Sequence, residues 1–242
     1  QYRHLMTDPS ITEHYRVIAF DIPWHGKSNP PVGWQECEYK LTTGLYKETV
    51  LTFCQAMELD HPVILGCSMG GRIVLHLALE DPDEFRAVIA LEGADRLEPY
   101  YDTEWLHRPD IHGGEIAAAF VSGQVAPQSP SEYRWETLWA YMQGGPGIFK
   151  GDLYFYWVDG HFDDRSARID TTRCPVYLLS GEYDSSCTPE RTRDTAKRIK
   201  GSKAKVMEGV SHFPCQRTLR YSENISYRYW KKFGQTGEFL SS

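Results

Sequence analysis

The chain has 242 residues, of which 41% are hydrophobic and 24% charged, and its formal net charge is −7 at pH 7. This length suits one large α/β domain or a domain with an insertion. The negative charge and the lack of a basic stripe exclude nucleic acid as an expected partner, and apolar runs of about six residues are too short for a membrane span.

The spacing of apolar residues predicts strands that alternate with helices along the chain. Strands are expected at residues 15–21, 63–65, 86–91, 175–180 and 203–207, and helices at 42–59, 72–79 and 188–199. Such alternation is typical of a parallel sheet with helices on both faces. We therefore predict an α/β fold with a mostly parallel, doubly wound sheet.

Residues 94–168 interrupt this alternation, with helical stretches, no obvious strand and fourteen aromatic side chains. Their position between two sheet strands predicts a helical cap over the carboxyl ends of the strands, where open α/β sheets bind ligands. The chain then divides into a first core part (1–93), the cap (94–168) and a second core part (169–242).

Most aromatic side chains at helical spacing would form the core of this cap, and about a third are expected to line a substrate pocket. The candidates for substrate binding are Trp135, Trp139, Tyr154 and Trp157, two of them just beyond a glycine-rich hinge at 144–147.

The segment Gly66-Cys67-Ser68-Met69-Gly70 joins a predicted strand directly to a predicted helix. In that setting the pattern G-x-S-x-G predicts a nucleophile elbow, a tight turn that strains the serine backbone and exposes its hydroxyl at the edge of the sheet. Ser68 is therefore the candidate nucleophile. The backbone N–H of Met69 is a candidate donor for an oxyanion hole.

Four segments then occur in a characteristic order: FDIPWHGKS at 20–28, GCSMGG at 66–71, GEYD at 181–184 and GVSHFP at 209–214. With them, residues 15–215 resemble the α/β-hydrolase superfamily, in its single-lid branch of lactonases, esterases and C–C hydrolases. That family arranges its catalytic residues in the order Ser…Asp…His. The resemblance implies that Ser68 is the nucleophile, His212 the base and Asp184 the acid, with no cofactor and no metal.

This chemistry needs an imidazole because neutral serine is a poor nucleophile, and a carboxylate to orient that imidazole. Glu182 is the nearest rival to Asp184, and Glu92, after the 86–91 strand, is a more distant one because some relatives draw the acid from there. Asp21 and His25 lie in a turn and are expected to be structural.

The family also places a strand and a His-Gly loop upstream of the 20–28 segment, and the loop supplies the second oxyanion donor. Residues 1–14 contain neither. We therefore expect a gap in the sheet between the 15–21 strand and the elbow strand. The explanation that we favour is that the chain lacks its natural N-terminus. The alternative is a protein that has lost this oxyanion donor and with it its activity. The family's closing amphipathic helix fits residues 215–242 poorly.

A serine nucleophile favours attack on a carbonyl carbon. We expect a serine hydrolase that cleaves a small carboxylic ester or lactone with an apolar or aromatic group. The alternatives are a C–C bond hydrolase of ring-cleavage diketones, which would hold a carboxylate with Arg108, Arg134 or Arg165, a thioesterase, or a non-catalytic protein of the same fold.

The six cysteines, at positions 37, 54, 67, 174, 187 and 215, have neither the spacing of metal ligands nor the density of a disulfide framework. This usage predicts free thiols in a reducing compartment and hence a cytoplasmic protein.

Overall fold

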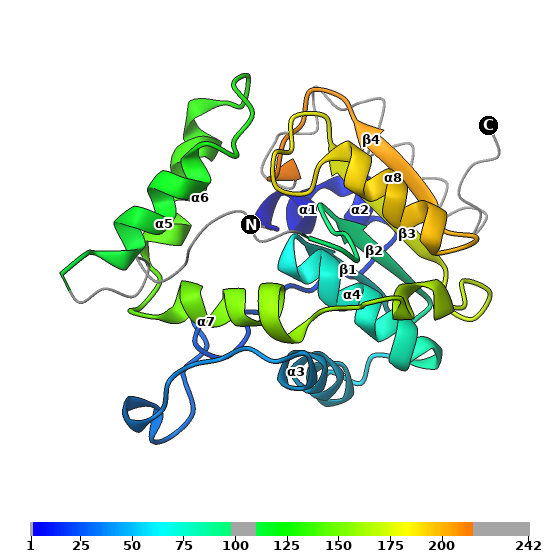
Figure 1. Ribbon diagram of the computed structural model, residues 1–242, viewed down its shortest axis with the longest axis horizontal. Helices are drawn as coiled ribbons and strands as arrows, with labels where there is room; N and C mark the ends of the chain where they lie inside the picture. The colour runs from blue at the N-terminus through cyan, green and yellow to red at the C-terminus, as the bar shows by residue number, and fades with distance from the viewer. Residues whose placement is uncertain (1, 98–109, 215–242) are drawn as a thin grey trace.

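The computed structural model describes residues 2–97 and 110–214. A sheet of four parallel strands lies at its centre, in the order β1 (Val63–Cys67), β2 (Ala87–Leu91), β3 (Val176–Gly181) and β4 (Lys203–Met207). The helices α3 (Thr43–Ala56), α4 (Met69–Glu80) and α8 (Pro189–Arg198) surround it (Figure 1). The predicted α/β fold with a parallel sheet is confirmed.

All three predicted core helices form, and two of them begin at a side-chain cap. The Thr42 hydroxyl accepts a hydrogen bond from the Leu45 N–H and caps α3, and Thr188 caps α8 in the same way through the Arg191 N–H, with Pro189 in the first turn. Such caps satisfy amide groups that have no partner within the helix. The helices α3, α4 and α8 begin and end within a few residues of the bounds predicted from the sequence.

The strands β2 and β3 are apolar along nearly their whole length because both faces of the sheet are covered. On one face, Val88, Ala90, Val176 and Leu178 join the main core with α3 and α4. On the other face, Ala87, Ile89, Leu91 and Tyr177 form a second cluster, against which Tyr2 and Leu5 of the N-terminal segment pack.

The described residues between β2 and β3 form helices joined by loops and turns. They contain α5 (Gly113–Ser122), α6 (Ser131–Met142), α7 (Ile148–Tyr154), the π-helical turn η4 (Phe155–Asp159) and the 3-10 turn η5 (Arg165–Arg168). The helices α5 and α6 pack against each other and project to one side of the sheet (Figure 1). Three of the fourteen aromatic residues of 94–168 (Tyr100, Tyr101 and Trp105) and the candidate cation Arg108 lie outside the described residues, as does the tail 215–242.

The predicted strand at 15–21 does not form. A strand needs a neighbour with which to exchange backbone hydrogen bonds, and a hollow of about 440 Å³ separates this segment from β1. Tyr15, Val17, Ile18 and the residues 63–66 of β1 line this hollow. The segment is instead attached to α3, where the Phe20 and Phe53 rings stack with centroids 3.9 Å apart.

The remaining short elements lie at the N-terminus and in connections. They are α1 (Arg3–Thr7), α2 (Pro9–Thr12), and the 3-10 turns η1 (Trp34–Glu36) and η2 (Pro82–Glu84). Among the described residues, no helix is both long enough and apolar enough to cross a membrane.

Candidate active site

The turn between β1 and α4 holds Ser68 in an uncommon backbone conformation, with φ 57° and ψ −113°. A non-glycine residue in this region carries strain of roughly 1–3 kcal/mol. The turn is fixed at both ends, because the Ser68 N–H donates to the Leu91 carbonyl and the Arg72 N–H donates to the Ser68 carbonyl, both at 2.9 Å. The side chain of Ser68 is half-buried.

The glycines of the motif allow the strand and the helix to come this close. A Cβ on Gly66 would lie 2.1 Å from the carbonyl oxygen of Gly70, which is far inside van der Waals contact. Met69 is the first residue of α4, so its N–H has no acceptor within the helix. The turn thus presents a strained serine beside a free helix N–H, the arrangement that stabilises a developing oxyanion.

Asp184 follows β3 and is fully buried at its side chain. Its Oδ1 accepts the N–H groups of Ser186 at 2.7 Å and Cys187 at 3.0 Å, and its Oδ2 lies 2.9 Å from Nδ1 of His212. Burial raises the pKa of this carboxyl, but the charge and hydrogen bond of His212 outweigh that effect, so the pKa lies below its usual value. Asp184 is therefore ionised and oriented.

The loop after β4 carries His212 and is tied to two other segments. The Ser211 hydroxyl donates to the Gln124 carbonyl at 2.7 Å and to the Tyr183 carbonyl at 3.0 Å. A Cβ on Gly181 would lie 2.6 Å from the Val210 carbonyl oxygen, so glycine is needed where the loops of Asp184 and His212 meet. The loop that carries His212 is therefore held by the loop after β3 and by the connection after α5, and these contacts fix the position of the imidazole.

The elbow lies against the same loop, since the Cys67 thiol donates to the His212 carbonyl with a sulfur–oxygen distance of 3.5 Å. The structure thus brings together the segments of all three predicted catalytic residues, at positions 68, 184 and 212. Among the described residues, no hydrogen bond joins the Ser68 hydroxyl to the imidazole. Such contacts are often long before substrate binds.

The rival carboxylates have other surroundings. Glu182 is exposed and accepts the Gly209 N–H at 2.8 Å. Asp21 accepts the Lys27 N–H at 3.0 Å within its own turn. Glu92, in contrast, is fully buried, accepts the Gly181 N–H at 2.9 Å and lies close enough to Asp184 to shift its pKa. Of the two predicted rivals, Glu182 is thus an exposed loop carboxylate and Glu92 a buried neighbour of Asp184, while Asp21 lies within its own turn.

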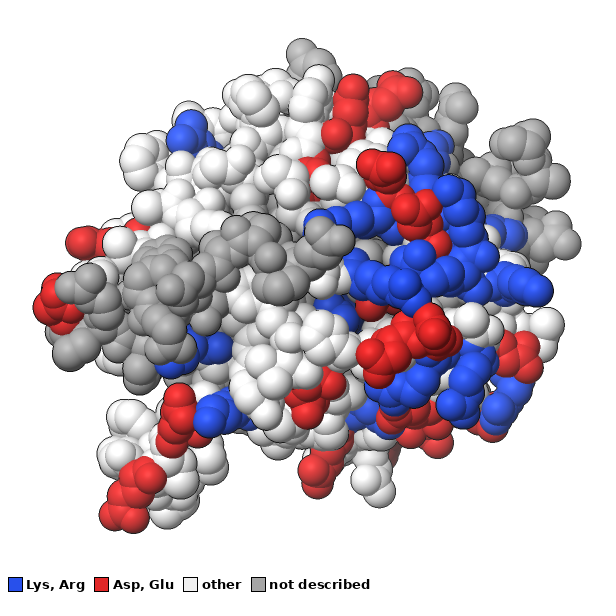
Figure 2. Space-filling view, viewed as in Figure 1, with Lys and Arg blue, Asp and Glu red and all other residues white. Residues whose placement is uncertain are grey.

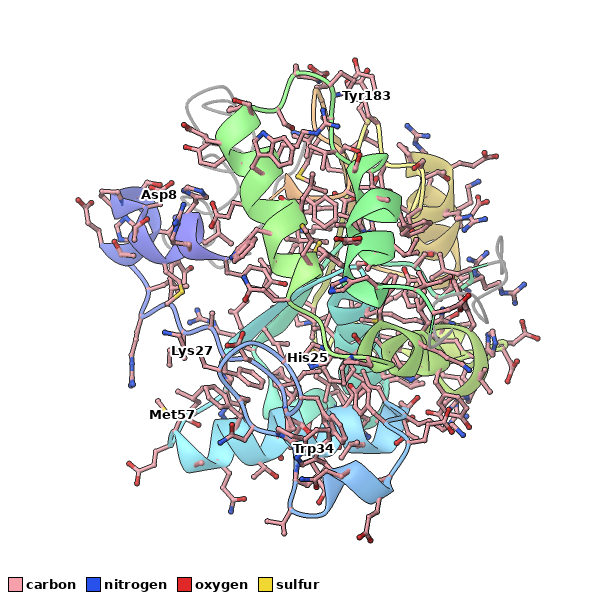
Figure 3. The ribbon with its side chains drawn as sticks, turned by 90° about the vertical axis from the view of Figure 1, so that its left-hand side faces the viewer. Asp8, His25, Lys27, Trp34, Met57 and Tyr183 are labelled. Atoms are coloured by element: carbon pink, nitrogen blue, oxygen red, sulfur yellow. The ribbon has the colours of Figure 1, made fainter. Side chains whose placement is uncertain are left out.

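His25 links the 21–39 loop to α7. Its Nε2 lies 3.0 Å from Oδ2 of Asp152, and the Tyr39 hydroxyl donates to Oδ1 of the same carboxylate at 2.8 Å. Burial lowers the pKa of His25, but the hydrogen bond and charge of Asp152 raise it above its usual value. His25 and Trp34 lie on this loop, and both are below Tyr183 in the view of Figure 3.

The four predicted substrate-binding residues lie in three different surroundings. Trp135 and Trp139 are 67% and 64% exposed on α6. Tyr154 borders a small hollow with Trp24 and Trp34. Trp157 packs against a buried cluster that includes Tyr156 and Cys187, and Met69 packs against the same cluster.

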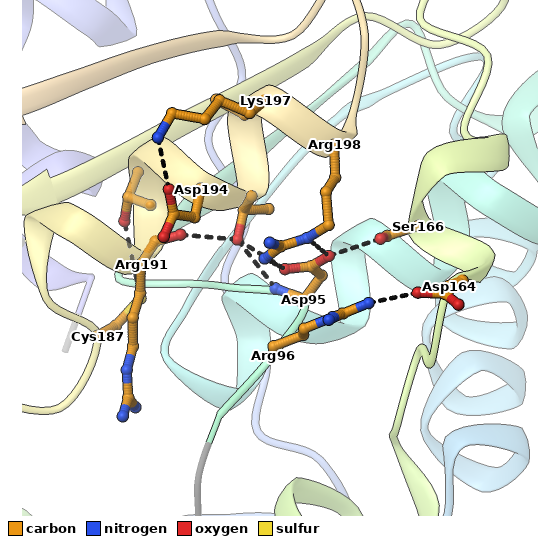
Figure 4. Close-up of polar contacts among 12 residues, drawn as sticks. Asp95, Arg96, Asp164, Ser166, Cys187, Arg191, Asp194, Lys197 and Arg198 are labelled. Atoms are coloured by element: carbon orange, nitrogen blue, oxygen red, sulfur yellow. Dashed lines mark hydrogen bonds and ion pairs between the residues drawn. The ribbon is translucent and has the colours of Figure 1, made fainter.

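Lys and Arg side chains gather over α8, with Asp and Glu side chains among them (Figure 2). Buried Asp95 lies at the centre of their contacts: it accepts hydrogen bonds from Arg198, Ser166 and Thr195, while Lys197 binds Asp194 at 2.7 Å (Figure 4). Sequence reasoning missed this network, although the alternating charges of 190–198 on a predicted helix were a signal for it. Because Asp and Glu side chains lie between the Lys and Arg side chains over α8, these charged residues form a network of ion pairs.

Five described cysteines are free thiols, at positions 37, 54, 67, 174 and 187. Cys215 lies outside the described residues. Within the described part of the chain, no group of three or more His, Cys, Asp or Glu side chains is placed to hold a metal ion.

Comparison with known proteins gives consistent results. A family model described as "alpha/beta hydrolase fold" matches residues 2–215. The pimeloyl-[acyl-carrier protein] methyl ester esterase of Neisseria meningitidis serogroup B is 25% identical over 237 residues, which cover 88% of this chain and 82% of that protein.

Two solved structures share the fold. A thermophilic esterase from Thermogutta terrifontis superposes with a TM-score of 0.79 at 18% identity, covering 97% of this chain and 85% of that one. A meta-cleavage product hydrolase from Pseudomonas fluorescens gives 0.73 at 15% identity, covering 98% and 85%. At these identities the likeness concerns the fold.

Proposed function

Because this chain belongs to the α/β-hydrolase fold family, we propose that it is a serine hydrolase that cleaves a carboxylic ester or lactone through an acyl-enzyme. Hydrolase activity agrees with the family and with the names of its relatives. The observation that carries the finer proposal is the buried contact of 2.9 Å between His212 and Asp184, on a loop that also touches the strained elbow of Ser68.

In the proposed mechanism, the Ser68 hydroxyl attacks the carbonyl carbon as Nε2 of His212 takes its proton. Asp184 holds the Nδ1–H tautomer and stabilises the imidazolium that forms. The Met69 N–H donates to the oxyanion of the tetrahedral intermediate. His212 then protonates the leaving alcohol, and water, deprotonated by His212, hydrolyses the acyl-enzyme to the acid and free Ser68.

A p-nitrophenyl ester assay with short acyl chains tests this proposal. We expect turnover in the parent protein and a loss of at least about a thousandfold in kcat for Ser68→Ala. Turnover that survives in Ser68→Ala would exclude Ser68 as the nucleophile. A parent protein that neither turns over these esters nor reacts at Ser68 with an organophosphorus inhibitor would favour the non-catalytic alternative.

We infer that the acyl or alcohol group is apolar and contacts Trp157, because this ring and Met69 pack against one buried cluster. Burial favours Trp157 over the exposed Trp135 and Trp139. We expect Trp157→Ala to lower kcat/KM for apolar esters at least tenfold, about 1.4 kcal/mol. Trp34→Ala, on the 21–39 loop, is the matched control and is expected to keep the parent's kcat/KM. Equal kcat/KM in both variants would contradict this role.

The C–C hydrolase alternative needs a cation that holds the substrate carboxylate. Of the described candidates, Arg134 donates to the Ser122 hydroxyl, and Arg165 contacts Glu80 and the carbonyls of Phe162 and His161. Both guanidinium groups thus have structural partners, which favours the ester over the diketone. A thioester differs from an ester only in its leaving group, so thioesterase activity fits the same triad and is tested with acyl-thioester substrates by measuring the thiol that is released.

A further inference from the structure

We propose that Glu92 is a positioning residue, a neutral carboxylic acid that donates a hydrogen bond to Asp184 and so holds the acid in register with His212. This inference rests on the triad of the proposed function. It assigns a role to a buried carboxyl group that the ester mechanism itself does not use.

Glu92 is held firmly in place at the end of β2. Its side chain is fully buried, and its backbone has a φ of 48°. The Glu92 N–H donates to the Leu179 carbonyl at 2.8 Å. In return, the Gly181 N–H lies 2.9 Å from each oxygen of the Glu92 carboxyl group. Glu92 therefore connects the end of β2 to the end of β3 through its backbone and its side chain, next to the loop that carries Asp184.

The carboxyl groups of Glu92 and Asp184 lie close enough for each to shift the pKa of the other. Two carboxylates in contact and away from water cannot both be ionised, so one of them must carry a proton. Within the described part of the chain, Asp184 receives two backbone N–H groups and the imidazole, whereas Glu92 receives only the Gly181 N–H. The negative charge is better stabilised on Asp184, and the proton therefore belongs to Glu92.

The surrounding groups support the same assignment. Burial and the charge of Asp184 hold the pKa of Glu92 well above its usual value, while His212 keeps that of Asp184 below its own. Cys187 also faces the pair, and burial raises the pKa of its thiol, so it stays neutral. Arg191 is turned to the Ser186 carbonyl at 3.3 Å. Among these groups, His212 is therefore the side chain that hydrogen bonds to the charged carboxylate of Asp184.

Three variants separate a neutral donor from an ionised group. Glu92→Gln keeps a neutral side chain that can donate to Asp184 and accept from Gly181. Glu92→Met fills a similar volume but removes both hydrogen bonds. Glu48→Met, on the exposed face of α3, controls for the exchange of glutamate for methionine elsewhere. The pH profiles of kcat and kcat/KM are measured for each variant with a p-nitrophenyl ester.

We expect Glu92→Gln to stay within about twofold of the parent, with an unchanged acid limb of the profile. Glu92→Met should lose about ten- to a hundredfold in kcat, with little change in KM, as expected when a hydrogen bond to a charged group is removed. A loss in Glu92→Gln as large as that in Glu92→Met would overturn the proposal, as would full activity in Glu92→Met.

Infrared spectroscopy tests the protonation state without substrate. The parent protein at neutral pH should show the carbonyl stretching band of a protonated carboxylic acid, and Glu92→Gln should lack it. If the parent has this band but no turnover that depends on Ser68, the proposed function fails while the carboxyl pair stands. If the parent has turnover but no such band, the neutral Glu92 is excluded and the triad stands.

Discussion

The Nδ1 atom of His212 lies 2.9 Å from Oδ2 of Asp184, and both side chains are buried. From this contact we predict that Asp184→Asn lowers kcat for ester hydrolysis by about a thousandfold or more, since the amide favours the wrong imidazole tautomer. Glu182→Gln is the control, because glutamine can still accept the Gly209 N–H. A larger loss of kcat in Glu182→Gln than in Asp184→Asn would reassign the acid.

The tight turn at Ser68 requires glycine at position 66, which has no Cβ. A Cβ there would lie 2.1 Å from the Gly70 carbonyl oxygen, so Gly66→Ala must displace the backbone next to Ser68. We expect the free energy of unfolding to fall by about 3 kcal/mol, together with the loss of esterase activity. Gly44→Ala in α3, where nothing lies within 4 Å of the added Cβ, should be neutral or stabilise by up to about 1 kcal/mol. Urea unfolding of both variants makes the comparison, and equal stability would contradict it.

We predict that the buried side chain of His76 makes the folded protein less stable at acid pH. Burial lowers its pKa from 6.5 to about 4, and its Nδ1 is buried without a hydrogen-bond partner. The unfolded chain therefore binds a proton at pH values where the folded chain does not. Stability is present above pH 6.5 and falls by roughly 3 kcal/mol as the pH drops toward 4.

Urea unfolding at several pH values tests this dependence. His76→Gln should show a weaker fall in stability between pH 6.5 and 4 than the parent protein. His14→Gln, at an exposed site, should keep the parent's slope. Parallel curves for His76→Gln and the parent would show that His76 is not the group responsible.

Asp152 of α7 forms hydrogen bonds with Tyr39 and His25 and so connects this helix to the 21–39 loop. Tyr39→Phe removes a hydrogen bond to this buried carboxylate, and we expect it to destabilise the fold by about 1.5–3 kcal/mol. Tyr183→Phe, at a site that is 51% exposed, should change the free energy of unfolding by less than about 0.5 kcal/mol. Thermal or urea unfolding measures both, and a Tyr39→Phe variant as stable as Tyr183→Phe would argue against this anchor.

Much of the core was predictable because its signals are local. The apolar run before G-x-S-x-G and the Thr-Pro start of α8 place strands and helices within a few residues, and β4 has its predicted bounds. The segment 15–21 has the same strand-like composition, but a strand forms only where a neighbour can pair with it. That condition depends on tertiary structure.

The site divides in the same way. Motif order placed Ser68, Asp184 and His212 on segments that the structure brings together, and their catalytic roles stay predictions. The proximity of Glu92 and Asp184 brings together residues that follow two different strands, and no local sequence pattern encodes it. Helical spacing likewise cannot tell a ring that faces the core, such as Trp157, from an exposed one, such as Trp135.

The most direct test of the central claim is the reaction of the protein with a fluorophosphonate, followed by mass spectrometry of the labelled peptide. The triad predicts one equivalent of label on Ser68, with much slower labelling in Asp184→Asn and His212→Ala. Labelling of another residue, or labelling of Ser68 at an equal rate in all three proteins, would contradict a serine activated by His212 and Asp184.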